Sequence, residues 1–272
     1  MGLFNRGKSE RTHNAVATRG ANLSSQDQNG HSVDEIANLI STAAAGNIDK
    51  DLFKRLVSVI RRSVKMSRKG VTISGQGIAD VLAKIAPRIP VSDLETMRQR
   101  SGGMSGDSLA AYQIKKSSRQ SAAVGALVGG VASAQWVAPP TWLMLSAEIL
   151  VETLVISAIE MKMVAELHVI YGHPITGTMD ERGRAILAAW ADQRGIRVDQ
   201  LDQGLKDAAH RGARGQLVNL VRRKLIARAA RNVSSVAPFL VGAGAAGAIN
   251  RGATRTLGNK VVQDLGHRTI DA

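Results

Sequence analysis

The chain has 272 residues, with 36 lysines and arginines against 22 aspartates and glutamates, and no cysteine. Without cysteine there are no disulfides, no thiol chemistry and no cysteine-ligated metal, and the formal net charge of +14 indicates an anionic partner: nucleic acid, an acidic protein or anionic lipid. Aromatic residues make up only 3% of the sequence, so we predict an all-α protein whose core is built from small and aliphatic side chains.

Residues 1–31 are polar and lack apolar periodicity, so we expect a disordered tail. The segment has no apolar run of the length that export needs, and we expect a protein that is not secreted. We divide the remaining chain into an N-terminal helical region (32–118) and a second helical domain (119–272). In the first region, Ser32 and Glu35 form a capping-box pattern before a helix that should end at Gly46.

The clearest helical pattern lies between residues 50 and 69. Its apolar residues fall on one face, and its basic residues fall on the other without an intervening acid. Such a face either attaches to an anionic surface, membrane or nucleic acid, or is the solvated side of a bundle helix. The basic residues that would meet an anionic surface are Lys54, Arg55, Arg61, Arg62, Lys65 and Arg68.

A weak repeat follows, in which residues 73–79 resemble residues 104–110 and a serine precedes each of two predicted helices. The first of these helices should end at Pro87, and a short helix should follow Asp93. Two copies are too few for a solenoid, so the repeat indicates a duplicated helix pair.

The centre of the chain is predicted to be a long helical hairpin. No charged residue lies between Arg119 and Glu148, and Pro139-Pro140 separates a small-residue arm from an apolar arm that ends at Tyr171-Gly172. Glycine destabilises the interior of a helix, so several glycines in one helix indicate close contact with a second helix. We therefore assign Gly125 and Gly129 to helix packing, and Trp136 and Trp142 at the corner to an interfacial position.

The second arm carries a charged stripe, which argues against a simple lipid-facing span. It consists of Glu148, Glu152, Lys162 and Glu166, while Glu160 and His168 lie elsewhere on the helix. The stripe must face water, protein or cations. A carboxylate-bridged metal would need a Glu-x-x-His spacing that is missing, so we favour ion pairs, with the basic residues downstream as partners, and expect no metal and no cofactor.

The C-terminal third begins with a predicted helix from 180 to 194, ended by Gly195, and continues with a basic segment from 203 to 232. An uncharged small-residue segment follows at 233–250. Its glycines match a dinucleotide-binding fingerprint in form, but a strand and further βα units are missing, so we interpret them as helix-packing residues. The basic residues assigned to an anionic surface here are Arg222, Arg223, Lys224 and Arg228, and the packing glycines are Gly242, Gly244 and Gly247.

The second domain resembles the EcsC-like bacterial proteins over roughly 121–265. The resemblance rests on the glycine-rich run and proline break, Tyr171-Gly172, the helix start at 180–182, the segment 236–244, and Asn250 with Thr254. It implies an all-helical protein, named from an operon with an ABC transporter, that is often suspected of membrane association and has no agreed enzymatic activity. The acidic stripe is where this chain departs from a membrane span.

We therefore predict a non-enzymatic protein, peripheral to the cytoplasmic face of the membrane, whose partner is an anionic membrane surface or a membrane protein. It would associate with the membrane through its basic amphipathic helices and its Gly/Ala-rich packing segments. It would be an accessory to transport or secretion. The alternative is a nucleic-acid-binding protein that uses the same basic helices on phosphates, although no known binding motif is present. An enzyme ranks third, because Glu148, Glu152, Glu166 and His168 would be its only candidate acids and base.

Overall fold

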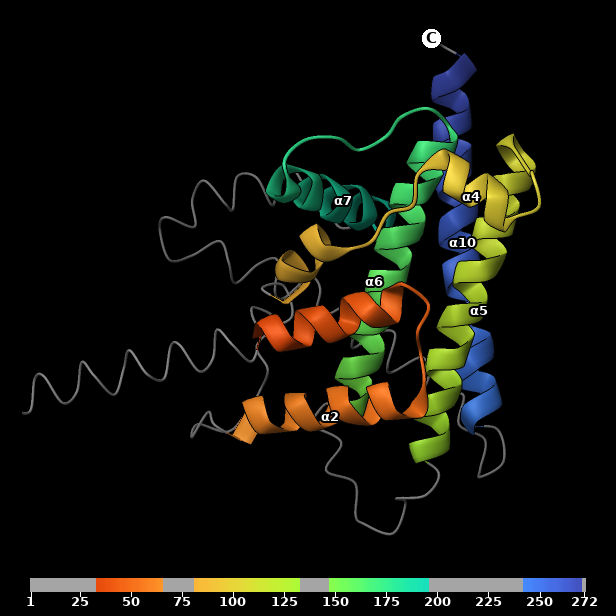
Figure 1. The fold of residues 1–272 in the computed structure, drawn as a ribbon. Helices are drawn as coiled ribbons and strands as arrows, with labels where there is room; N and C mark the ends of the chain where they lie inside the picture. The colour runs from red at the N-terminus through yellow and green to blue at the C-terminus, as the bar shows by residue number, and fades with distance from the viewer. Residues whose placement is uncertain (1–32, 66–80, 133–146, 196–241, 271–272) are drawn as a thin grey trace, which may run out of the picture.

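The computed structural model describes residues 33–65, 81–132, 147–195 and 242–270 (Figure 1). Within these ranges the chain is helical and contains no strand, which confirms the all-α prediction. The tail predicted for residues 1–31 lies outside the described residues. The helices are residues 33–44, α2 (Lys50–Lys65), residues 81–85, the 3-10 turn η1 (Ala86–Arg88), α4 (Leu94–Arg100), α5 (Gly106–Ala132), α6 (Ala147–Ile170), α7 (Met179–Gln193) and α10 (Gly242–Ile270).

Helix α6 is the centre of the fold. It contacts α2, α5, α7 and α10, and every residue from 154 to 167 is buried. A helix enclosed on all sides has no solvated stripe, and its sequence is therefore apolar around most of its circumference. With α5 it forms the two arms of the central hairpin, as predicted from the sequence; the connection through 133–146 lies outside the described residues (Figure 1).

Helices α5 and α10 pack along each other with opposite chain directions (Figure 1). The hydroxyls of Ser121 and Thr254 lie 2.9 Å apart at the middle of this contact. Helix α5 is continuous across the domain boundary predicted between residues 118 and 119, because the polar residues there are compatible with a helix and several are buried against its neighbours. The core is correspondingly one cluster that includes side chains from both sides of that boundary.

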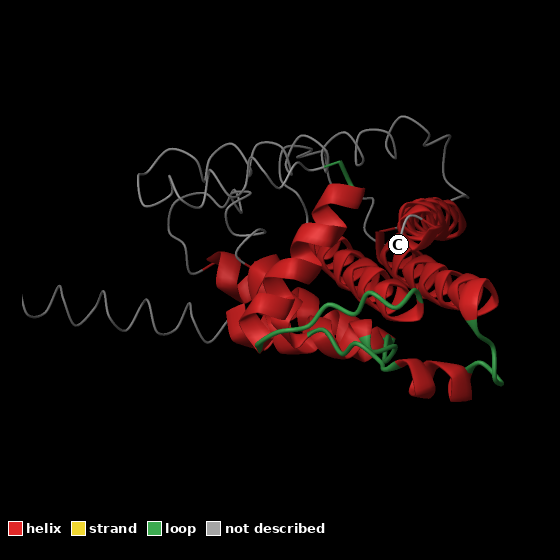
Figure 2. Ribbon diagram, turned by 90° about the horizontal axis from the view of Figure 1, so that it is seen from above, coloured by secondary structure: helices red, strands yellow, loops and turns green. Residues whose placement is uncertain are grey.

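Helix α2 crosses the end of α6 that is lowest in Figure 1. Its apolar residues Phe53, Leu56, Val57, Val59 and Ile60 are buried, and Leu52 is half-buried, as the periodicity predicts. The preceding helix ends near Gly46, whose φ of +113° few other residues tolerate. Seen from above in Figure 2, helices connected by short loops make up all of the described chain.

Helix α7 begins with a capping box and lies against η1. The Thr178 hydroxyl accepts a hydrogen bond from the backbone N–H of Glu181, whose carboxylate accepts from the N–H of Thr178 at 2.9 Å. Gly183 lies so close to η1 that a Cβ there would be 2.5 Å from the Cγ of Pro87. The helix stops before Gly195, which has a φ of +65°.

Helix α4 is the short helix predicted after Asp93, whose carboxylate caps it by accepting the N–H of Thr96 at 2.8 Å. Helix α5 starts directly after the serine of the second repeat copy, whereas the first copy lies outside the described residues. In the described part of the chain, no helix combines the length and apolarity that crossing a membrane requires.

Candidate functional site: a paired polar core and an outer basic surface

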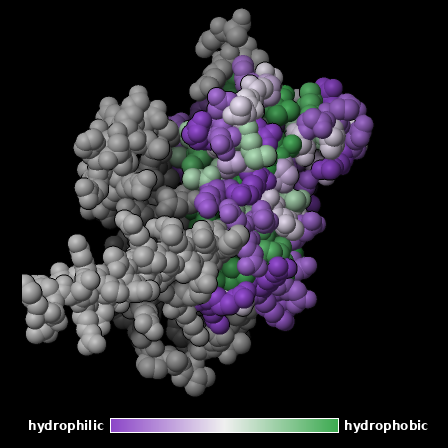
Figure 3. Space-filling view, turned by 60° about the vertical axis from the view of Figure 1, so that its left-hand side comes forward, coloured by the Kyte–Doolittle hydropathy of each residue, from purple (hydrophilic) through white to green (hydrophobic). Residues whose placement is uncertain are grey.

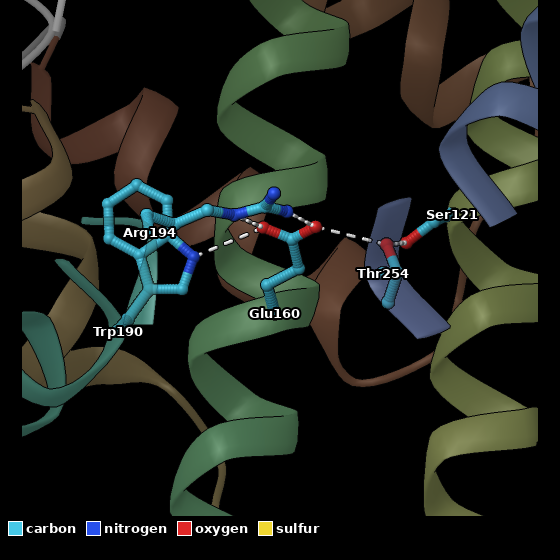
Figure 4. A network of polar contacts seen from close by, with 5 residues as sticks. All are labelled: Ser121, Glu160, Trp190, Arg194 and Thr254. Atoms are coloured by element: carbon cyan, nitrogen blue, oxygen red, sulfur yellow. Dashed lines mark hydrogen bonds and ion pairs between the residues drawn. The ribbon is translucent and has the colours of Figure 1, made fainter. Parts of the chain in front are cut away.

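A buried carboxylate joins three helices at the centre of the molecule (Figure 4). Glu160 of α6 is 1% exposed and accepts hydrogen bonds from Trp190 Nε1 at 3.1 Å, Arg194 Nε at 3.1 Å and Thr254 Oγ1 at 3.0 Å. A second guanidinium nitrogen of Arg194 makes an ion pair with the other carboxylate oxygen. Thr254 also bonds to Ser121, so the network extends from α7 through α6 and α10 to α5. Every oxygen of Glu160 is thus occupied by a donor.

A second buried pair lies one turn further along α6. Lys162 and Glu166, four residues apart, form an ion pair and are 7% and 2% exposed. The ammonium group of Lys162 also donates to the carbonyl of Pro90 at 2.7 Å, and Glu166 accepts the N–H of Ser92 at 3.3 Å. The pair therefore fixes the loop before α4 against α6, with each charge partnered as burial demands.

The remaining two acids of the stripe also face protein. Glu152 accepts from the side-chain amide of Asn250 at 2.6 Å, and Glu148 forms an ion pair with Arg61 of α2. The sequence favours a solvated or ion-paired stripe that meets the basic segment at 203–232, and this segment lies outside the described residues. Among the described residues, the partners of the stripe lie on α2, α6 and α10, and Glu160, which lies off the stripe, is the most buried of these acids.

These carboxylates hold helices together, and their hydrogen-bonding capacity is used within the fold. Among the described side chains, no group of three or more histidines, aspartates and glutamates could hold a metal ion. His168 lies at the other end of α6 from Glu148, and its Nδ1 is 2.8 Å from the carbonyl of Val164. The structure does not bring the histidine and the acids proposed for the enzyme interpretation into one exposed site.

The outer surface of α2 is basic. Lys54, Arg55, Arg61 and Arg62 are all exposed, while the apolar side of the helix is buried against the core. Three of them have acidic neighbours: Arg55 lies 3.4 Å from Glu35, Lys54 lies 3.7 Å from Asp51, and Arg61 pairs with Glu148. The pairs of Lys54 and Arg55 are exposed and therefore weak in water, so these two cations and Arg62 keep most of their capacity to attract an anion, whereas Arg61 is held by the largely buried Glu148.

The other basic residues assigned to this surface are not described in the same detail. Lys65 is the last residue of α2, and nothing is described of its side chain. Outside the described residues are Arg68, Arg222, Arg223, Lys224 and Arg228, together with the two tryptophans assigned to an interface, Trp136 and Trp142.

Two of the glycines assigned to helix packing lie in the contact between α5 and α10. A Cβ on Gly125 would be 2.8 Å from the carbonyl oxygen of Ala246, and one on Gly247 would be 2.9 Å from that of Ala122. Only glycine permits so close an approach. Gly129 lies near the end of α5, and Gly242 and Gly244 lie in the first turn of α10, which shows that the fingerprint glycines belong to a helix.

The sequence interpretation missed a second set of exposed cations, on α5 and α10. They are Lys115, Arg119, Arg251 and Arg255. Their spacing of four residues within each helix was visible in the sequence, but the pairing of the two helices was not. On the face shown in Figure 3, hydrophilic side chains cover most of the described surface and apolar side chains form small patches.

Comparisons with models of known protein families, with curated proteins and with solved structures find no match for this chain.

Proposed function

We propose that this chain is a non-enzymatic helical protein that attaches by charge to the anionic cytoplasmic face of a membrane. There it acts as an accessory to transport or secretion. One observation carries the proposal: α2 presents Lys54, Arg55, Arg61 and Arg62 outward while the apolar side of the same helix is buried in the core.

The burial of that apolar side supports attachment by charge over insertion. An amphipathic helix that enters a bilayer does so with its apolar face, but Phe53, Leu56 and Ile60 of α2 are at most 5% exposed and are part of the core. The described parts of the small-residue segments are packed against each other as well, since Gly125 and Gly247 bring α5 and α10 together. Contact through charge, without insertion, is the mode that this packing supports.

The charges are sufficient for such contact. A basic residue near an anionic membrane surface contributes about 1 kcal/mol, so a few acting together give a measurable, salt-sensitive affinity. The net charge of +14 adds long-range attraction. Screening reduces this attraction strongly between about 0.1 M and about 1 M salt, because the Debye length falls from about 10 Å to about 3 Å.

Flotation of the full-length protein with vesicles tests the proposal. The protein should float with phosphatidylcholine vesicles that contain phosphatidylglycerol and not with phosphatidylcholine alone, and about 1 M salt should release it. Lys54→Gln with Arg62→Gln should weaken flotation. A matched control, Arg98→Gln with Arg100→Gln on exposed positions of α4, should weaken it less.

Two outcomes would contradict the proposal. Failure to float with anionic vesicles at low salt would end it, and if the protein then bound DNA or RNA in a filter assay, the nucleic-acid alternative would take its place. Flotation that resisted both salt and a carbonate wash would show insertion and would contradict attachment by charge.

A further inference from the structure

The outer side of the α5–α10 pair carries a cluster of exposed basic residues, which we call the basic quartet: Lys115, Arg119, Arg251 and Arg255. The register of the two helices places them in one stretch. A Cβ on Gly258 would touch Ile114 at 2.7 Å, and a Cβ on Gly125 would lie 2.5 Å from the side-chain nitrogen of Asn250, so the residues between these contacts on each helix lie next to each other. Lys115 and Arg119 fall in that stretch on α5, as do Arg251 and Arg255 on α10.

The two basic residues of α5 lie on the side of that helix that borders α10. Lys115, Arg119 and Ala122 follow at i, i+4 and i+7, which places them on one stripe. The carbonyl of Ala122 is the group that Gly247 of α10 approaches. The stripe therefore runs along the outer edge of the helix contact.

The two arginines of α10 lie on the matching side. The opposite flank of α10 faces α6 and α7, because Asn250 donates to a carboxylate of α6 and the ammonium of Lys260 lies 3.4 Å from the carbonyl of Gln193 at the end of α7. Successive residues of a helix are turned by about 100°, which puts Arg251 and Arg255 on the flank that borders α5. All four cations of the quartet are exposed there.

The basic quartet has no acidic neighbour in the described part of the chain. No ion pair formed there includes any of its members, whereas three of the four exposed cations named above on α2 (Lys54, Arg55 and Arg61) have one. Like charges one turn apart, roughly 6 Å along each helix, repel one another, so the cluster costs stability. A bound anion would remove that cost.

Several exposed residues beside the cations are small. They include Ala126 on α5 and Ala248 and Gly252 on α10, which leave room for a partner to approach, while Asn259 is exposed one turn after Arg255. No aromatic side chain in the described ranges is exposed, so stacking on bases finds no support here. Phosphate groups at a membrane surface can be attracted by the charge of these cations without aromatic stacking.

We propose that the basic quartet on the α5–α10 face binds the phosphate groups of an anionic bilayer. This inference rests on the proposed membrane attachment and assigns it a second surface, distinct from α2. The four cations, which form no ion pair with a described residue, supply the charge, and the small exposed residues beside them leave room for the lipid phosphates.

Vesicle binding by full-length variants tests this assignment. The quartet variant carries Lys115→Gln, Arg119→Gln, Arg251→Gln and Arg255→Gln. Its matched control removes four exposed cations from other faces, through Arg98→Gln, Arg100→Gln, Arg184→Gln and Lys260→Gln. On phosphatidylcholine vesicles with phosphatidylglycerol, the quartet variant should bind at least about tenfold more weakly than the wild type, and the control much less so.

The outcomes separate the two proposals. If the wild type binds and the quartet variant binds equally well, the quartet assignment fails while membrane attachment stands. If the wild type does not bind vesicles, the proposed membrane attachment fails. If the wild type then binds DNA and the quartet variant does not, the quartet is assigned to nucleic acid instead. The quartet variant should unfold at a temperature no lower than the wild type, because only like-charge repulsion is removed.

A label provides a measurement that leaves the charges in place. Because the chain has no cysteine, Ala248→Cys can carry a single environment-sensitive fluorophore within the quartet, and Ala185→Cys on an exposed position of α7 serves as control. Anionic vesicles should change the emission at position 248 more than at 185. An equal or smaller change at 248 would overturn the assignment.

Discussion

Replacing Glu160 with glutamine tests whether one buried carboxylate holds α6, α7 and α10 together. The carboxylate accepts the indole N–H of Trp190, two donors of Arg194 and the hydroxyl of Thr254. Glutamine keeps the shape but replaces one acceptor oxygen with an NH₂ group, which must then face a donor. Arg194 simultaneously loses its counter-charge.

The cost follows from the burial of the pair. Removing one partner of a buried ion pair destabilises a protein by about 3–5 kcal/mol. The side chain of Arg194 is 23% exposed, so water compensates part of its charge and we expect a loss of about 3 kcal/mol, at the lower end of that range. For a chain of this size, that corresponds to a fall in Tm of roughly 6–12 °C.

Urea and thermal unfolding followed by far-UV circular dichroism measure this loss. Glu95→Gln is the matched control, because Glu95 is exposed on α4 and its replacement should change the free energy of unfolding by less than about 0.5 kcal/mol. If Glu160→Gln were as stable as this control, the carboxylate would not hold the helices, and our account of the polar core would be wrong.

Three further predictions concern local features. Burial and the Asp107 carboxylate raise the pKa of Tyr171 from 10.0 to about 12, so the stabilisation by the neutral phenol is complete below pH 10 and is lost as the pH rises through 12. An absorbance titration of a variant in which the other tyrosine is changed to phenylalanine should give a pKa of about 12 for Tyr171, and Asp107→Asn should lower that pKa. Gly125→Val should cost about 2 kcal/mol or more in urea unfolding, since its side chain would meet the backbone of α10, whereas Gly252→Ala, with open space around it, should stabilise by up to about 1 kcal/mol; equal stability of the two would contradict the close packing. Thr178→Ala removes the cap of α7 and should lower the free energy of unfolding by about 1 kcal/mol, and an unchanged value would show that the cap is not needed.

The sequence predicted the helices better than their partners. The buried side of α2 and the central hairpin follow from local spacing and from the uncharged run before Glu148. The partners of the acidic stripe could not be predicted from local spacing, because Arg61 lies 87 positions from Glu148 and Asn250 lies 98 positions from Glu152. Only the packing of helices brings such residues together.

Two features of the site were not predicted from the sequence, each for a physical reason. Glu160 lies off the predicted stripe, and its burial depends on α7 and α10 covering the other side of α6. The length of α10 was also not predicted. Its buried apolar residues Leu257, Val261 and Leu265 form only a narrow stripe, and many small and polar residues surround them in the sequence. The register that this helix adopts against α5 is what assembles the basic quartet.

The measurement that tests the central claim most directly is the affinity of the wild-type protein for anionic and neutral vesicles as a function of salt. Our account predicts binding to phosphatidylglycerol-containing vesicles that weakens steadily as salt rises from about 0.05 M to about 0.5 M, and little binding to phosphatidylcholine. Equal affinity for both kinds of vesicle, or an affinity that salt does not change, would contradict attachment by charge.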